Sequence, residues 1–398
     1  MPPSVVLGVT GSIAAYKAVD ILRRMAGRGY GVSVVMTESA CRFVSPLTFE
    51  VLSRQKVCRS LWDEPLSHIE LAGADLILVA PATANIIAKA AAGVADDLLS
   101  TLLIAAEAEK TLFAPAMNHR MFGNPIVQGQ IDLLAGHGFT FIPPETGDLA
   151  CGEEGMGRLA DLDEIMSYAD RTLREHDMRD ENVLITSGPT RESLDPVRFI
   201  SNRSSGKMGA ALAREAFNRG ANVTIVSGPT NNADAYIPKA IKCVRVETAG
   251  QMHRAVMEEA GRATTAVLAA AVSDYAPRIS RSLKTPKNSE PEPLELVSTP
   301  DILMELGQME RRPFLVGFSA ETGPCTDRAL EKLRLKNCDL MVFNDVIAAG
   351  AGFDVDTNVV SLIDPSGKVN PLPVMSKDAV ARSVFDRVLD MKALRGQQ

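Results

Sequence analysis

The sequence predicts an α/β protein made of two doubly wound, Rossmann-like domains with mostly parallel sheets. At 398 residues the chain is longer than a typical single domain, so two domains are expected. Short apolar runs also alternate with helical stretches in two separate series, which is typical of parallel sheets. Each apolar run ends in a small, polar or glycine-rich loop, where open α/β sheets bind ligands. We therefore expect the functional residues in these loops.

The first series fills the N-terminal half. We expect strands at 5–9, 32–36, 76–80 and 112–116 and a helix from about residue 13 to 28. Between Tyr168 and Glu181 the chain is highly charged and has no apolar stripe after Leu173, which indicates a helix end and a linker. We therefore expect one domain at 1–178 and a second at 179–398.

The second series repeats the pattern. We expect its strands at 182–186, 222–226, 266–270, 314–318 and 339–344. The segment 280–293 is rich in proline, serine and charge, which favours a mobile loop projecting from this domain.

The composition argues against several classes of function. A content of 46% apolar and 23% charged residues is that of a soluble globular protein, and a net charge of -7 gives no electrostatic reason to bind nucleic acid. The uncharged, apolar run 76–88 is too short to span a membrane and contains Pro81. No basic stretch followed by an apolar one opens the chain, so we expect neither a signal peptide nor a membrane partner.

The number and spacing of the cysteines and histidines limit the kinds of functional site that are expected. Six scattered cysteines without a CxxC pair predict neither a zinc site nor a disulfide framework, and fit a reducing cytoplasm. No metal ligands can be assigned from the sequence. Since only five histidines are present, few residues can act as bases, and His68 becomes a candidate.

The first expected strand runs into GVTGSIAAYK, Gly8 to Lys17, a tight turn that feeds a helix. Backbone N–H groups and the helix dipole favour a phosphate at such a place, and Ser12 and Thr37 can add hydroxyl groups. Thr10 breaks the G-x-G-x-x-G pattern of dinucleotide sites. A plain β-α turn is the alternative.

Four further blocks follow in order: HIEL (68–71), APATANIIAK (80–89), PAMN (115–118) and ACGEEGMGR (150–158). Together they resemble the homo-oligomeric flavin-containing cysteine decarboxylases, specifically the phosphopantothenoylcysteine decarboxylases, over nearly all of 4–165. The resemblance implies bound FMN. It places these residues at the cofactor: Gly11, Ser12, Thr37, Thr83, Asn85 and Ser100.

The resemblance also implies catalytic roles. Loss of CO2 from a cysteinyl amide needs an electron sink, which oxidation of the thiol to a thioaldehyde provides. By the match, His68 is the base in the oxidation, Asn118 holds the departing carboxylate and Cys151 returns a proton to the enethiolate. The alternatives are a structural histidine, an asparagine that caps a helix and a cysteine of the core.

The second domain opens with ITSGPTRESLDPVRFISNRSSGKMG, Ile185 to Gly209. Its end is not a P-loop, because Ser201 stands where the first glycine is required and Met208 where serine or threonine is required. The phosphate loop Ser204, Ser205 and Gly206 precedes an expected helix, so an anion is still favoured there.

This block and those at 223–230, 269–275, 299–303, 316–322 and 332–345 closely resemble the bacterial phosphopantothenate-cysteine ligases over 182–390. Two such families fused in this order are the pattern of a bifunctional enzyme of coenzyme A biosynthesis. The resemblance implies conversion of 4'-phosphopantothenate and cysteine to 4'-phosphopantetheine, with CTP, Mg2+ and homo-oligomers, trimers and higher for the decarboxylase and dimers for the ligase.

The ligase resemblance assigns residues to an acyl-cytidylate mechanism. Lys332 and Lys336 lie one helical turn apart and suit the triphosphate, helped by Mg2+. Asn202 matches the contact to the acyl intermediate. The residues matched to the nucleotide site are Asp274, Pro300, Asp301, Ile302, Leu303 and Phe318. The alternatives are a solvated lysine face, a turn at Asp274 and a helix cap at Asn202.

The chain departs from the ligase family in one loop. The family carries a Lys-hydrophobic-Lys cluster there, whereas this chain reads RSLKTPK, 281–287. If Leu283 is the hydrophobic position, Ser282 replaces the first lysine and Lys284 is retained as the catalytic lysine. Arg281 and Lys287 are the alternatives.

Two rival functions remain. A generic flavin or nicotinamide oxidoreductase with a nucleotide-binding appendage leaves Cys151, Lys332 and Lys336 without roles. A regulatory flavoprotein of the same fold, which binds a partner protein without turnover, would be favoured by loss of His68 or Cys151, and both are present.

Overall fold

The computed structural model describes residues 2–62, 66–148, 152–230, 237–284, 293–321, 323, 326–345, 352 and 355–396. The chain forms two compact units, Met1–Glu175 and His176–Gln398, called here the N-terminal and the C-terminal unit. The assignment of the two activities to 1–178 and 179–398 stays a prediction.

The N-terminal unit is built on a five-stranded parallel sheet in the order β2-β1-β3-β4-β5. Its strands are β1 Ser4–Val9, β2 Gly31–Met36, β3 Leu76–Ala82, β4 Thr111–Pro115 and β5 Thr140–Phe141. This is the strand order of the flavodoxin-like doubly wound fold, which reverses direction between β1 and β3. The four expected strands are confirmed, and β5 is an addition.

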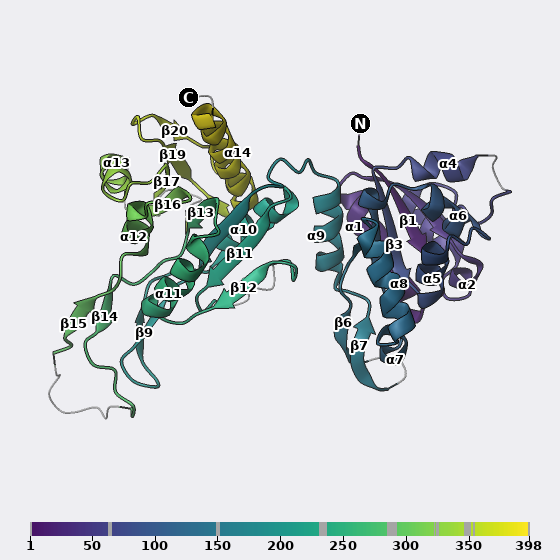
Figure 1. Cartoon of the computed structure of the whole chain (residues 1–398), viewed down its shortest axis with the longest axis horizontal. Helices are drawn as coiled ribbons and strands as arrows, with labels where there is room; N and C mark the ends of the chain where they lie inside the picture. Colours follow the sequence, from purple (N-terminus) through teal and green to yellow (C-terminus); the bar gives the residue numbers. More distant parts are fainter. Residues whose placement is uncertain are drawn as a thin grey trace. The chain divides into compact units, whose positions relative to one another are not determined.

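Helices cover both faces of this sheet (Figure 1). They are η1 Ile13–Tyr16, α1 Lys17–Gly27, α2 Glu38–Cys41, α3 Pro46–Ser53, α4 Ser67–Ala72, α5 Ala84–Ala92, α6 Leu98–Ala105, η2 Ala108–Lys110, α7 His119–Phe122, α8 Pro125–Gly136 and α9 Leu162–Thr172. Successive side chains of a strand point to opposite faces. Leu7 therefore packs in one cluster with α1, while Val6 packs in another with α5 and α6.

The expected helix at 13–28 differs at its start. Residues 13–16 form the 3-10 turn η1, and the α-helix α1 begins only at Lys17. The side chain of Ser12 accepts a hydrogen bond from the N–H of Ala14, which tightens the first turn.

The C-terminal unit has an eight-stranded sheet in the order β12-β11-β8-β13-β16-β17-β19-β20. Its strands are β8 Asn182–Ser187, β11 Asn222–Ser227, β12 Lys242–Arg245, β13 Thr265–Leu268, β16 Phe314–Glu321, β17 Leu340–Asp345, β19 Val360–Ile363 and β20 Val369–Pro371. The six strands from β12 to β17 are parallel and follow the Rossmann order, which reverses between β8 and β13. Antiparallel β19 and β20, which were not expected, extend the edge.

Five helices flank this sheet in the described part of the unit. They are α10 Lys207–Asn218, α11 Ala249–Ala260, α12 Ile302–Gln308, α13 Thr326–Leu335 and α14 Lys377–Gly396. One apolar cluster joins β8 to α10 and α14, and another joins the opposite face to α11, α12 and α13. Both expected doubly wound domains are therefore present.

Small antiparallel pairs extend from both units (Figure 1). They are β6 Glu145–Asp148 with β7 Glu154–Arg158, β9 Arg191–Ser193 with β10 Phe199–Ser201, β14 Tyr275–Pro277 with β15 Leu296–Ser298, and β18 Thr357–Asn358 with β21 Met375–Ser376. None of the described helices is both long and apolar enough to cross a bilayer.

Candidate active sites

The loops after β1 and β3 are tied together at the point where the strand order of the N-terminal unit reverses. Thr10 is buried; its hydroxyl donates to the carbonyl oxygen of Pro81 (2.7 Å) and accepts from the N–H of Thr83 (3.1 Å). This junction is where a doubly wound sheet binds its ligand.

The loop after β1 also depends on a glycine. A Cβ at Gly11 would lie 2.4 Å from the Cβ of Ser39, so only glycine allows the loop to approach α2 this closely. Ser12 and Thr37 each accept a backbone N–H at 3.3 Å and so cap η1 and α2. A hydroxyl group that accepts in this way still has its own proton to donate to an anion.

The other predicted cofactor residues differ in their exposure. Thr83 precedes α5 without a side-chain cap, and Asn85 is exposed. Ser100 is fully buried: its N–H donates to Oδ1 of Asp97 (2.8 Å), and its Oγ accepts the N–H of Asp97 (3.0 Å). This capping box fixes the start of α6, so a contact of Ser100 with the flavin stays a prediction.

The three predicted catalytic residues of this unit lie in different segments. His68 is half-buried in α4. Asn118 caps α7, because its Oδ1 accepts the N–H of Arg120 (2.8 Å). The carboxamide of Asn118 also carries an N–H2 group, which is a hydrogen-bond donor. Cys151 lies outside the described residues.

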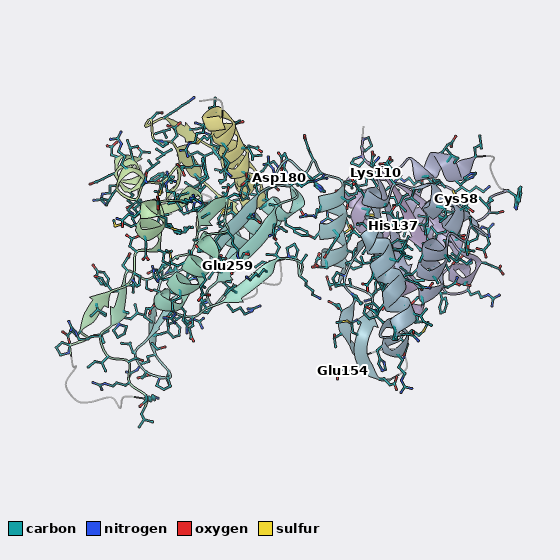
Figure 2. The ribbon with its side chains drawn as sticks, viewed as in Figure 1. Cys58, Lys110, His137, Glu154, Asp180 and Glu259 are labelled. Carbon is teal, nitrogen blue, oxygen red and sulfur yellow. The ribbon has the colours of Figure 1, made fainter. Side chains whose placement is uncertain are left out.

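The hairpin β6–β7, whose two strands flank Cys151 in the sequence, packs against the Asn118 loop. The N–H of Met117 donates to the carbonyl oxygen of Gly157 (2.9 Å). A Cβ at Gly157 would lie 2.3 Å from the carbonyl oxygen of Met117, and one at Gly155 would lie 2.6 Å from the Cβ of His119. Figure 2 labels Glu154, which begins β7 at the end of this hairpin. The spaced glycines of EEGMGR signal this close approach, which the sequence analysis missed.

In the C-terminal unit the predicted phosphate loop directly precedes α10. Gly206 caps the helix with φ +78°, and its carbonyl oxygen accepts the hydroxyl of Ser187 (3.1 Å). A Cβ at Gly209 would lie 2.3 Å from Oγ of Ser187. The N-terminus of α10 therefore lies against the end of β8, with the N–H groups of its first turn directed at the loop.

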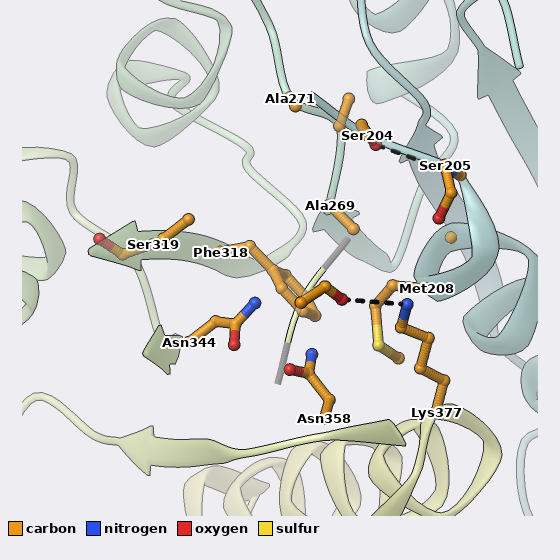
Figure 3. A pocket seen from close by; sticks show the side chains of 15 residues that line it. Ser204, Ser205, Met208, Ala269, Ala271, Phe318, Ser319, Asn344, Asn358 and Lys377 are labelled. Atoms are coloured by element: carbon orange, nitrogen blue, oxygen red, sulfur yellow. Dashed lines mark hydrogen bonds between the residues drawn. The ribbon is translucent and has the colours of Figure 1, made fainter. Parts of the chain in front are cut away.

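A pocket of about 110 Å3 opens beside this helix terminus (Figure 3). It is lined by the phosphate loop, by residues 269–271 after β13 and by 318–320 of β16. The pocket is also lined by three residues that were not predicted from the sequence: Asn344 of β17, Asn358 of β18 and Lys377 of α14. Of the residues predicted for the nucleotide, only Phe318 lines this pocket.

Lys332 of α13 and Lys336, which directly follows this helix, are each paired with a carboxylate. Nζ of Lys332 donates to Oε1 of Glu321 (2.6 Å) and to Oγ of Ser319 (3.3 Å), and this ammonium group holds the pKa of Glu321 below its ordinary value. Nζ of Lys336 lies 3.1 Å from Oδ2 of Asp301. Lys332 does not line the pocket itself, but it contacts Ser319, which does.

The remaining predicted ligase residues form a chain of contacts. Nδ2 of Asn202 donates to the carbonyl oxygen of Val272 (2.9 Å), so Asn202 does not cap a helix. The carbonyl oxygen of Asp274 accepts the N–H of Thr299 (3.0 Å), which leads into the 300–303 loop. Asp301 then caps α12 and pairs with Lys336, so the fold brings these segments together.

The 281–287 loop is only partly described. Lys284 is exposed, and the N–H of Arg281 donates to the carbonyl oxygen of Leu194 beside β9 (3.0 Å). Lys287 lies outside the described residues, so the predicted mobile loop at 280–293 is largely untested. Within the described chain no three His, Cys, Asp or Glu side chains are grouped so that they could hold a metal ion.

Comparison with known proteins agrees with this division into two sites. Residues 2–174 match the flavoprotein family, and residues 178–391 match the family described as the DNA/pantothenate metabolism flavoprotein C-terminal domain. The chain is 43% identical over 404 residues to the coenzyme A biosynthesis bifunctional protein CoaBC of Bacillus subtilis, covering 99% of this chain and 98% of the relative. The corresponding protein of Mycobacterium tuberculosis is 40% identical, with the same coverage.

Solved structures also resemble parts of the chain. The crystal structure of the C-terminal domain of a coenzyme A biosynthesis bifunctional protein CoaBC is 37% identical and covers 55% of this chain and 98% of that one, with a TM-score of 0.45. The FMN-dependent cysteine decarboxylase SpaF is 29% identical and covers 42% of this chain and 94% of that one, with a TM-score of 0.37.

Proposed function

Because the chain belongs to the family of bifunctional proteins of coenzyme A biosynthesis, we propose that its two units catalyse consecutive steps from 4'-phosphopantothenate to 4'-phosphopantetheine. The C-terminal unit is a ligase and the N-terminal unit is a flavoprotein decarboxylase. The ligase product, 4'-phosphopantothenoylcysteine, is the substrate of the decarboxylase.

In the ligase reaction an unreactive carboxylate must first be activated. A carboxylate oxygen of phosphopantothenate attacks the α-phosphorus of CTP, the bond to the β-phosphate oxygen breaks, and pyrophosphate leaves with the electron pair. The amine of cysteine then displaces CMP, loses a proton and forms the amide. Negative charge grows on the leaving phosphates in the first step, so cationic groups placed there accelerate it.

The observation that carries the ligase proposal is the pocket at the N-terminus of α10, one of whose lining residues, Ser319, contacts Lys332. The helix dipole acts on the triphosphate together with Lys332 and Lys336. Asn202 holds the acyl intermediate for the amine. Lys284 acts from the 281–287 loop. Mg2+ would enter with the triphosphate, whose oxygens are the kind of ligand that it prefers.

The loops of the N-terminal unit suit a flavin mononucleotide. The hydroxyl groups of Ser12 and Thr37 supply hydrogen-bond donors for one phosphate. The hydrogen bond between Thr10 and the loop after β3 and the close approach at Gly11 hold these loops in place. Bound FMN supplies the two-electron oxidation of the substrate thiol and its reversal.

Residues of the chain then move protons and hold the substrate. His68 takes the thiol proton, and the carboxamide of Asn118 donates to the carboxylate that leaves as CO2. Cys151 protonates the resulting enethiolate. The packing of β7 against the Asn118 loop supports this placement.

We also propose that the chain assembles into homo-oligomers in a reducing cytoplasm. Four apolar side chains on η1 and α3, Ile13, Tyr16, Leu47 and Val51, are each more than half exposed, which suits burial against a second copy. The four cysteines within the described ranges form no disulfide.

One experiment tests the proposed function as a whole. The purified full chain is given phosphopantothenate, cysteine and MgCTP under anaerobic conditions, while its flavin spectrum, pyrophosphate and CO2 are followed. We expect a yellow protein that releases one CO2 for each pyrophosphate. A yellow protein that releases neither product would support the regulatory flavoprotein instead.

A further inference from the structure

Two basic residues, His119 and Arg120, directly follow Asn118 at the start of α7. The N–H of Arg120 donates to Oδ1 of Asn118 (2.8 Å), so the first turn of the helix keeps Arg120 beside the proposed carboxylate site. Arginine is always charged, and its planar fork of donors matches a carboxylate. Without another partner, Arg120 would therefore bind the carboxylate of the substrate.

A carboxylate from the hairpin β6–β7 supplies that other partner. Oε1 of Glu153 accepts a hydrogen bond from the guanidinium group of Arg120 (2.7 Å). Oε2 of Glu153 lies 3.6 Å from Nδ1 of His119, a buried atom that has no hydrogen-bond partner within the described chain. Glu153, which directly precedes β7, therefore faces both basic residues and ties the side chain of Arg120 to the hairpin.

The hairpin does not depend on this ion pair for its place beside α7 (Figure 1). The backbone hydrogen bond between Met117 and Gly157 (2.9 Å) and the close approach of Gly155 to His119 already join the two segments. Exposed ion pairs contribute little to stability, and the side chain of Arg120 is 75% exposed. The charge of Glu153 therefore serves something other than folding.

The chemistry of decarboxylation makes an unpaired guanidinium group harmful at this place. The carboxylate of the bound substrate is negatively charged, whereas the CO2 that leaves is neutral. The electron pair of the broken C–C bond moves onto the thioaldehyde and ends on sulfur as the enethiolate. A cation at the carboxylate therefore stabilises the bound substrate more than the transition state, which tightens binding and slows the release of CO2. The neutral carboxamide of Asn118 holds the carboxylate without this disadvantage.

We propose that Glu153 is a positioning residue of the decarboxylase, which holds Arg120 so that no full positive charge pairs with the carboxylate of the substrate. The inference rests on the proposed decarboxylase activity and on the role assigned to Asn118. Glu153 acts only through Arg120 and His119 and takes no part in the bond that breaks. Its removal should therefore alter the binding of the carboxylate and the loss of CO2, but not the oxidation of the thiol.

The first measurement compares two ligands that differ only in the carboxylate. One is the serine analogue of 4'-phosphopantothenoylcysteine, whose hydroxyl group cannot be converted to a thioaldehyde, and the other is the same molecule without its carboxylate. Their affinities for the flavin-loaded full chain are measured by calorimetry. Glu153→Gln removes the charge with little change in size and should bind the first ligand about threefold to tenfold more tightly, because Arg120 is released to it. Binding of the second ligand should change less than about twofold.

The second measurement follows a single anaerobic turnover of the true substrate. Flavin reduction reports oxidation of the thiol, and released CO2 reports cleavage of the C–C bond. Glu153→Gln should reduce its flavin within about twofold of the wild-type rate but release CO2 about threefold to tenfold more slowly. A hairpin that had merely become loose would slow both steps and weaken the binding of both ligands.

Further variants serve as controls. Glu153→Asp keeps the charge and should stay closer to the wild type than Glu153→Gln in both measurements. Combining Arg120→Gln with Glu153→Gln should return the affinity for the first ligand to within about twofold of the wild type, because the released cation is gone. Glu107→Gln breaks a comparable exposed ion pair with Lys110 (3.0 Å) in the same unit and should alter neither affinity nor rate.

The alternatives give different results. Weaker binding of both ligands by Glu153→Gln would reduce Glu153 to a structural role, and unchanged affinities and rates would remove it from the reaction. A strong loss of affinity for both ligands after Arg120→Gln alone would make Arg120 a binding residue for the rest of the substrate. Each of these results overturns the proposal. If the wild-type chain releases no CO2 from phosphopantothenoylcysteine, the decarboxylase proposal itself fails.

Discussion

The two units present their predicted site residues in different ways. In the N-terminal unit Ser12, Thr37 and Asn118 cap short helices. In the C-terminal unit segments far apart in the sequence meet at one pocket, and Lys332 is held by an ion pair. The N-terminal unit thus offers neutral hydrogen-bond donors, and its chemistry depends on a bound cofactor. The C-terminal unit carries its own charges into its site, so the two should respond differently to substitution.

The largest effect is expected in the N-terminal unit at Cys151. Cys151→Ser should let CO2 leave but block the final protonation, because a hydroxyl is a far weaker acid than a thiol. Formation of phosphopantetheine should fall on the order of 100-fold to 10,000-fold, with an oxidised enethiol accumulating. Product analysis by mass spectrometry checks this. Exposed Cys243 in the other unit provides the control, Cys243→Ser. Unchanged phosphopantetheine formation by Cys151→Ser would remove Cys151 from the mechanism.

The next effect lies in the C-terminal unit and separates its two chemical steps. Asn202→Asp should still release pyrophosphate from CTP and phosphopantothenate, because Asn202 is assigned to the acyl intermediate. Amide formation should fall on the order of 100-fold, because the intermediate is no longer held for the amine. Quenched samples are assayed for pyrophosphate, acyl-CMP and amide. Equal losses of pyrophosphate and amide would refute the assigned role.

A smaller effect is expected at the flavin phosphate. Gly11→Ala places a Cβ 2.4 Å from that of Ser39, so the loop must shift at a cost of about 1–3 kcal/mol. This cost corresponds to about fivefold to 150-fold weaker FMN binding. Flavin titration measures this. Gly27→Ala, in α1 with no atom within 4 Å of the new methyl group, should bind FMN as the wild type does. Equal affinity in both variants would exclude the loop from the flavin site.

The last expected effect concerns stability rather than catalysis, and no loss of either activity is expected from it. Burial alone would raise the pKa of Asp339, but hydrogen bonds from Arg312, the N–H of Leu315 and Arg395 hold it below its ordinary value. A lowered folded-state pKa contributes stability that is present above the unfolded pKa of about 3.9 and is lost as the pH falls below it.

Calorimetry at several pH values tests this assignment. Asp339→Asn should destabilise the C-terminal unit by about 3–5 kcal/mol at neutral pH and flatten its pH dependence below about pH 4. Asp163→Asn, which removes an exposed partner of Arg24 in the other unit, should cost less than about 1 kcal/mol. If Asp339→Asn leaves the pH dependence of stability unchanged, that dependence arises from other groups.

The sequence predicted long buried strands well and short pieces poorly. β3 is buried along its whole length, so its unbroken apolar run was recognisable. β5, β9 and β18 have two or three residues each, too few for any periodicity. The helix α14 was not among the expected elements, although buried residues such as Val380, Val384 and Val388 recur at helical spacing.

The candidate sites divide in the same way. Residues in continuous blocks, such as Ser204 to Gly206, could be recognised from neighbouring letters. Asn358 and Lys377 could not, because they reach the pocket only through the antiparallel pairing of β18 with β21 and the start of α14. Spacing along the chain carries no information about such a contact.

The central claim is that each unit catalyses its own reaction independently and that the product of the ligase is the substrate of the decarboxylase. Lys332→Gln in the full chain tests it most directly, with substrates for either unit supplied separately. We predict almost no pyrophosphate from CTP and phosphopantothenate, because the cation beside the phosphates is lost, and wild-type release of CO2 from supplied phosphopantothenoylcysteine. Loss of both activities in a folded, flavin-loaded variant would contradict the independence of the two sites.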